Sequence, residues 1–62
     1  MNHLKEIRLD RKLSVSQLSI KSGITRQTIH RLENEADSRA NTKTLKALAD
    51  ALEVKVSDFF VD

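Results

Sequence analysis

The sequence of 62 residues contains no cysteine, proline, tryptophan or tyrosine, and it contains one glycine. The lack of cysteine excludes disulfides, iron–sulfur clusters and thiolate metal sites. His3 and His30 are too few for a histidine-based zinc site without carboxylates, so we expect no metal and no cofactor. No apolar run approaches the roughly 18 residues that span a bilayer, and no signal-peptide pattern is present. These absences predict a soluble, cytoplasmic protein with no membrane partner and no evident small-molecule ligand.

Scarce glycine and proline favour helices, because these two residues interrupt regular structure. With 39% hydrophobic and 32% charged residues, the composition is that of a globular chain rather than a disordered one. A chain this short forms one domain and buries only about 60% of its unfolded surface. We therefore predict an all-α fold of four to five short helices, in a single domain over residues 1–62.

The two halves of the chain differ in charge. Residues 1–31 hold seven basic and two acidic side chains, whereas residues 32–62 hold four basic and seven acidic ones. The total is +2, with an isoelectric point near 9.3. A basic half suggests a face that meets a polyanion. An unevenly charged, solvated helical surface would give the same pattern, so charge alone leaves both interpretations open.

Apolar spacing and capping residues divide the chain into short helical segments. The predicted helices cover about 2–12, 15–22, 26–34 and 42–52, and a short turn follows over 57–61. Suitable N-caps for the second, third and fourth helices are Ser14, Thr25 and Asn41 or Thr42. Gly23 enters the left-handed region without a Cβ penalty, which predicts a sharp turn there. Residues 34–40 lack an apolar stripe and are predicted to form a loop.

The third predicted helix has a polar face of unusual composition. At about 100° per residue, Ile29 and Leu32 define its buried side. The opposite side carries Arg26, Gln27, His30 and Arg31, with no acidic residue among them. Arginine pairs with guanine and glutamine with adenine in the major groove, so these residue types suit base recognition. Exposed polar helix faces are common, and this feature alone does not decide the function.

The spacing over about 15–34 resembles the helix-turn-helix of phage repressor and Cro-type DNA-binding domains, the Xre family. The residues that carry the resemblance within the motif are Leu18, Ser19, Gly23, Ile24, Ile29 and Leu32. Outside it they are Leu4, Ile7, Arg8, Leu13, Ser14, Glu33, Asn34, Leu45, Leu48, Ala49, Ala51, Leu52, Val54 and Ser57 to Phe60. The resemblance spans roughly residues 3–60 and implies a compact repressor-like domain.

The resemblance also implies roles for individual residues. Helix 26–34 would be the recognition helix in the major groove, with the second helix across the backbone. The implied base-contacting residues are Arg26, Gln27, Thr28, His30 and Arg31, although Thr28 could meet a phosphate and His30 could be a pH sensor or only solvated. The implied phosphate contacts are Ser14, Thr25, Asn34, Arg39 and Lys43. Arg8 and Glu33 correspond to an internal salt bridge, with a free phosphate contact as the alternative for Arg8.

Several positions depart from the family pattern. Val15 stands where a glutamine usually contacts phosphate and braces the recognition helix. Glu35 replaces the usual glycine, and Asp37 follows it, so two acids occupy a loop expected near phosphates. Glu53 stands where glycine or asparagine usually ends the fourth helix. These changes leave the fold intact but weaken the expected electrostatic contribution to DNA affinity.

The closing residues contain both phenylalanines. Phe59 and Phe60 can close the small core, and at least one is expected to do so. Together with Val56 they can instead form a patch between two subunits. Because repressor-like domains bind as two-fold pairs on half-sites about 34 Å apart, the resemblance implies a homodimer on a two-fold symmetric operator.

The leading functional hypothesis is a sequence-specific DNA-binding transcriptional regulator, repressor-like, that binds double-stranded DNA and acts by occupancy. The alternative is a protein-interaction module on the same fold, such as an antitoxin or co-regulator, suggested by the acidic second half and the apolar tail. A nucleoid-type binder without sequence preference is disfavoured, because the net charge is only +2. An enzyme is not expected, since a few short helices provide no sheltered catalytic cleft and no phosphate-binding glycine loop or metal cluster is visible.

Overall fold

In the computed structural model, the described residues, 3–34 and 40–60, are helical throughout apart from short connections. The elements are α1 (Leu4–Asp10), α2 (Val15–Ser22), α3 (Arg26–Asn34), α4 (Thr42–Leu52) and a final 3₁₀ turn, η1 (Val56–Phe59). This confirms the compact all-α fold that was predicted. The bounds of α2, α3 and α4 are those expected from the sequence. Nearly all of the predicted loop, and Arg39 with it, lies outside the described residues.

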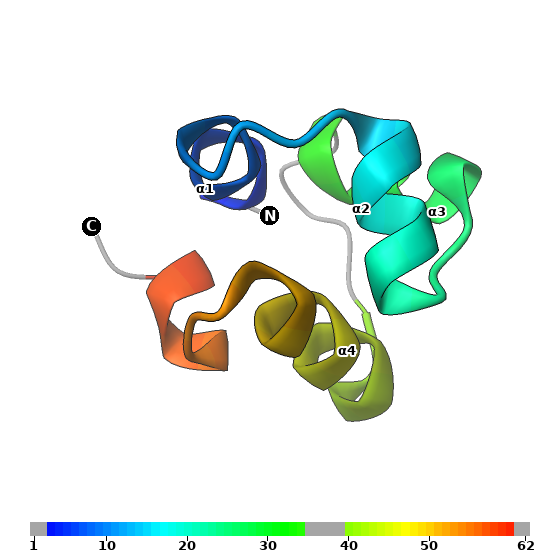
Figure 1. The fold of residues 1–62 in the computed structure, drawn as a ribbon. Coiled ribbons are helices and arrows are strands. Elements are labelled where there is room, and N and C mark those ends of the chain that lie inside the picture. The colour runs from blue at the N-terminus through cyan, green and yellow to red at the C-terminus, as the bar shows by residue number, and fades with distance from the viewer. Residues whose placement is uncertain (1–2, 35–39, 61–62) are drawn as a thin grey trace.

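The helices surround one apolar core. Helix α2 packs against both α3 and α4, α1 packs against α3, and η1 packs against α4. In Figure 1, α2 and α3 lie on one side of the domain and η1 lies on the other. The buried apolar residues are Leu4, Leu18, Ile29, Leu32, Leu48, Ala49, Leu52 and Phe59. Each helix therefore contributes at least one buried side chain to the core. Because Ile29 and Leu32 hold one side of α3 in this core, the opposite side of α3 is left to solvent.

Helix α1 is shorter at both ends than the predicted 2–12. It ends at Asp10 because Lys12 adopts a left-handed conformation with φ of 58°. The Lys12 amide donates to the Leu9 carbonyl at 2.9 Å, and the Leu13 amide donates to the Arg8 carbonyl at 3.2 Å. This pair of bonds is the Schellman ending, which normally uses glycine. A lysine there gives no sequence signal for the turn, so the prediction extended too far.

Helix α4 has a favourable start and a strained end. The Asn41 side-chain oxygen accepts the Thr44 amide at 2.8 Å and caps the first turn. At the other end, Glu53 is left-handed, with φ of 59°, while the Val54 amide donates to the Ala49 carbonyl at 3.0 Å. A side chain with a Cβ in this conformation costs about 1–2 kcal/mol. The departure seen at Glu53 in the sequence is therefore a real local strain.

Replacing this residue, Glu53→Gly, is expected to raise the free energy of unfolding by about 0.5–1 kcal/mol, because relief of strain exceeds the added entropy of the unfolded chain. Chemical denaturation of the two proteins measures the difference. The matched control is Asp50→Gly within α4, where glycine relieves no left-handed strain and should lower the free energy of unfolding by about 0.3 kcal/mol. A Glu53→Gly protein less stable than the parent would contradict the strain.

The C-terminal turn places the two phenylalanines differently. The Lys55 amide donates to the Asp58 carboxylate at 3.0 Å, which starts η1. The Phe59 ring is completely buried, whereas Phe60 is 52% exposed and Val56 is half-buried. Including Phe59 in a patch between subunits was therefore wrong, since its ring fills the core of its own domain. Of the three residues expected in that patch, Phe60 and Val56 are still at least partly accessible.

No helix in the described residues is long and apolar enough to cross a membrane. Within the same ranges, no group of three or more histidine or carboxylate side chains is placed to hold a metal ion.

Candidate nucleic-acid interface

The turn between α2 and α3 is held by backbone and hydroxyl hydrogen bonds. Gly23 is left-handed, with φ of 74°, and its amide donates to the Ser19 carbonyl at 2.9 Å. The Ser19 hydroxyl then donates to the Ile24 carbonyl at 2.6 Å. A Cβ at Gly23 would meet no atom within 4 Å, so glycine is needed here for its backbone angle and not for space. The turn directs α3 away from α2 at a fixed angle.

Thr25 lies directly before α3, and Thr28 lies in its first turn. The Thr25 hydroxyl oxygen accepts the Thr28 amide at 3.2 Å, and the Thr25 hydroxyl donates to the Thr28 hydroxyl oxygen at 2.9 Å. Thr25 is thus the N-cap that the sequence predicted. Thr25 is exposed, and its contact with a phosphate stays a prediction.

The outer face of α3 is polar and without acids. Its exposed side chains are those of Arg26, Gln27, His30, Arg31 and, at the end of the helix, Asn34. Gln27, Thr28 and Arg31 line a surface hollow of about 300 Å³. The one acid of the helix, Glu33, points inward and its side chain is only 3% exposed. Every formal charge on the outward face is therefore positive.

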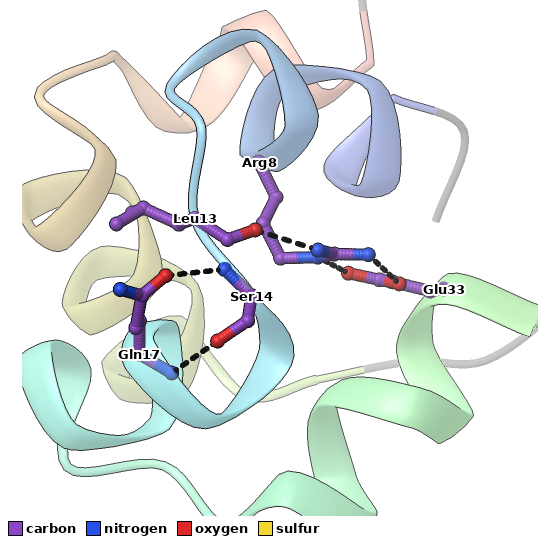
Figure 2. A network of polar contacts seen from close by, with 5 residues as sticks. All are labelled: Arg8, Leu13, Ser14, Gln17 and Glu33. Atoms are coloured by element: carbon purple, nitrogen blue, oxygen red, sulfur yellow. Dashed lines mark hydrogen bonds and ion pairs between the residues drawn. The ribbon is translucent and has the colours of Figure 1, made fainter.

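The start of α2 carries a reciprocal cap. The Ser14 hydroxyl oxygen accepts the Gln17 amide at 3.0 Å, and the Gln17 side-chain oxygen accepts the Ser14 amide at 2.8 Å (Figure 2). This capping box fixes the first turn of α2. Because the Ser14 oxygen only accepts here, its own proton remains to be donated. The exposed Ser14 can thus serve an anion at the helix N-terminus.

The buried guanidinium of Arg8 makes hydrogen bonds to the last turn of α3 and to the residues just before α2. Arg8 Nε donates to Glu33 Oε2 at 2.7 Å and Nη2 donates to Glu33 Oε1 at 3.1 Å, a two-point ion pair. Arg8 Nη1 donates to the Leu13 carbonyl at 2.7 Å, directly before Ser14. Figure 2 shows these contacts beside the capping box. The salt bridge implied by the family resemblance is present, and it ties the end of α3 to the start of α2.

The remaining phosphate candidates lie at other helix ends. Asn34 is exposed at the end of α3, and Lys43 is exposed in the first turn of α4. Arg39 falls outside the described residues. Ser14, Asn34 and Lys43 are thus all accessible, and each has at least one group that can donate to a phosphate oxygen.

The structure adds two residues that the sequence interpretation did not assign. Gln17 completes the cap of Ser14, and the Ser-x-x-Gln spacing would have indicated it. Ser16 approaches Arg26, whose Nη1 lies 3.5 Å from the Ser16 oxygen, at the outer limit of a hydrogen bond. Because Val15 cannot brace α3 through a polar group, this contact is the polar bridge from α2 to the recognition face. No sequence pattern indicates it.

A glycine turn between two packed helices, with an acid-free outer face on the second, defines a helix-turn-helix DNA-binding domain. Comparison with known families agrees, since the model of the Cro/C1-type HTH DNA-binding domain matches residues 3–62. The chain belongs to this family, which is a family of DNA-binding proteins and not of enzymes.

A curated relative supports this assignment. It is the uncharacterized HTH-type transcriptional regulator RghRB of Bacillus subtilis (strain 168), which is 43% identical over 51 residues. The matched region is 82% of this chain and 37% of the relative. The chain thus spans little more than a third of the length of that protein.

Proposed function

We propose that this protein regulates transcription by binding a specific DNA sequence, with the first turns of α3 in the major groove. The observation that carries the proposal is the acid-free face of Arg26, Gln27, His30 and Arg31 on a helix whose other side is fixed in the core. Arginine and glutamine make two-point contacts with purine edges. Occupancy of an operator would exclude other proteins, so the expected regulatory action is repression.

Backbone contacts would place the domain on the duplex. The proposed donors are Ser14 with the first amides of α2, Thr25, Asn34, Lys43 and, from the sequence, Arg39. Such contacts fix register and orientation without distinguishing bases. The buried Arg8 ion pair supports this arrangement, because it sets the distance between the start of α2 and the end of α3.

Pairing of two copies is also proposed. The half-exposed Phe60 and the half-buried Val56 belong to the C-terminal turn, which lies across the domain from α3 (Figure 1). A contact there would leave both recognition helices open. The domain measures 25 × 20 × 19 Å, so two copies can cover half-sites about 34 Å apart.

The test is selection of bound duplexes from a random pool, followed by measurement with Arg31→Ala. We expect a two-fold symmetric consensus and, for the variant, a loss of about 1–3 kcal/mol with relaxed preference at one base pair per half-site. Lys55→Ala removes the same charge at η1 and is the control, expected to bind nearly as the parent does. Equal affinity of the parent and Arg31→Ala proteins would contradict base contact by α3.

A protein partner is the second candidate function, favoured by the half-exposed Phe60 ring. The salt dependence of binding distinguishes a DNA-binding function from binding of a protein partner. Duplex binding through phosphates weakens steeply as salt rises, because counterions are released. Binding through Phe60 would change little with salt and would be lost in Phe60→Ala.

A further inference from the structure

Lys12, in the connection between α1 and α2, has a left-handed backbone with φ of 58°. Glycine adopts this conformation easily, whereas a residue with a Cβ is strained in it. The Lys12 side chain is exposed, so packing in the core does not compensate for the strain. Residues in such conformations cluster at binding sites, and a role of the Lys12 side chain in binding is therefore the explanation to examine.

The backbone that follows Lys12 is held by hydrogen bonds. The Leu13 carbonyl accepts Arg8 Nη1 at 2.7 Å. The Ser14 amide donates to Gln17 Oε1 at 2.8 Å. The Cα atoms of Lys12 and Ser14 are therefore at most about 7 Å apart, and these bonds keep their separation constant. The four-carbon stem of Lys12 can extend its ammonium to the phosphate proposed at Ser14.

The charge of Lys12 is not used inside the domain. Among the described residues, its side chain takes part in no ion pair or hydrogen bond. Arg11, the other cation at this end of α1, lines a hollow together with three carboxylates, so its charge is offset there. Lys12 is not among the residues that line this hollow. Of the two cations, Lys12 is thus the one whose charge is available to a polyanion.

We propose that Lys12 is a DNA-contacting residue, whose ammonium binds the same backbone phosphate as the start of α2. This rests on the proposed function and adds a cation to a position where Ser14 and backbone amides were the donors. A lysine binds a phosphate as a point charge, and the contact releases counterions from the duplex. A strained lysine then stands where glycine would be more stable, because its ammonium strengthens binding to DNA.

The test measures stability and affinity on the same variants, because the two should change in opposite directions. Lys12→Gly relieves the strain and removes the charge. We expect it to melt about 2–8 °C higher than the parent and to bind the selected duplex about twofold to tenfold more weakly. Lys12→Arg keeps both the strain and the charge, and should melt and bind as the parent does. Lys55→Ala removes the same charge at η1 and should also bind as the parent does.

The salt dependence of binding and a repeated selection identify the contact as one to a phosphate. For Lys12→Gly, the slope of log affinity against log salt should become shallower by about one, whereas Lys12→Arg should keep the slope of the parent. The consensus selected by Lys12→Gly should be that of the parent, because phosphate contacts do not distinguish bases.

An unchanged affinity or salt slope in Lys12→Gly, an equally large loss in Lys12→Arg, or an altered consensus would overturn the proposal. A Lys12→Gly protein that melts no higher than the parent would contradict the strain on which it depends. Failure of the proposed function is distinguishable, because the parent would then select no consensus. If the parent selects a consensus and Lys12→Gly binds it with the same affinity and salt slope, the role of Lys12 alone is refuted.

Discussion

Replacing Arg8 by methionine should lower the free energy of unfolding by about 3–5 kcal/mol, because it leaves the Glu33 carboxylate buried without its partner. The two side chains are only 8% and 3% exposed, and three of the guanidinium's hydrogen bonds would be lost with it. A domain of this size has little stability to lose. Urea denaturation followed by circular dichroism measures the change, and we expect the variant to be largely unfolded near room temperature.

The control for this variant is Lys5→Met, which removes the same charge from an exposed position of α1. Exposed substitutions of this kind usually change stability by less than about 0.5 kcal/mol. If Arg8→Met unfolded at the same urea concentration as Lys5→Met, the ion pair would contribute nothing to the fold. It would then also be unable to hold the start of α2 against the end of α3.

The second large effect is expected at the C-terminal turn, where Phe59→Ala should cost about 3–5 kcal/mol because it empties part of a small core. Phe60→Ala should change the stability of the isolated domain by less than about 0.5 kcal/mol, since its ring is 52% exposed. Thermal unfolding at low protein concentration compares the two. Similar melting temperatures for both variants would contradict the burial of Phe59.

The same two variants also distinguish a residue needed for the core from a residue needed for contact between two copies. If two copies pair through Phe60, then Phe60→Ala should shift sedimentation toward the single domain and weaken binding to a two-fold symmetric duplex more than to a half-site. A Phe60→Ala protein that pairs as the parent does would exclude this contact.

Helices with ordinary caps were predictable from the sequence, and those with unusual ends were not. Asn41 caps α4 by a familiar hydrogen bond, and Gly23 marks the turn that only a left-handed residue makes easily. Lys12 and Glu53 make the same kind of turn without glycine, so no residue type marks the end of α1. The end of α4 was placed from its apolar stripe instead. Residue type therefore indicates a left-handed turn where glycine forms it, but not where a lysine or a glutamate is held in the same conformation under strain.

The phenylalanines show a second limit. Phe59 and Phe60 are adjacent and chemically identical, so composition cannot tell which one enters the core. The short 3₁₀ turn from Val56 decides it, by rotating Phe59 inward and Phe60 outward. A helical wheel does not describe a turn of this kind.

At the interface, the residue types were predictable from the sequence, but some of the contacts between their side chains were not. The outward face of α3 follows from helix periodicity, because Ile29 and Leu32 fix its inner side. That the Thr25 and Thr28 hydroxyl oxygens lie 2.9 Å apart, within hydrogen-bond distance, is a contact that no spacing rule supplies. The contact of the Gln17 oxygen with the Ser14 amide is different, because the Ser-x-x-Gln spacing indicates a capping box.

The most direct measurement of the central claim is an NMR titration of the parent protein with a duplex that holds one half-site of the selected consensus, following every backbone amide. We predict that the largest changes fall on residues 26–31 and on the first turn of α2, while Val56 to Phe59 change little. Changes concentrated on η1, or no change at any helix, would contradict DNA binding through the outer face of α3.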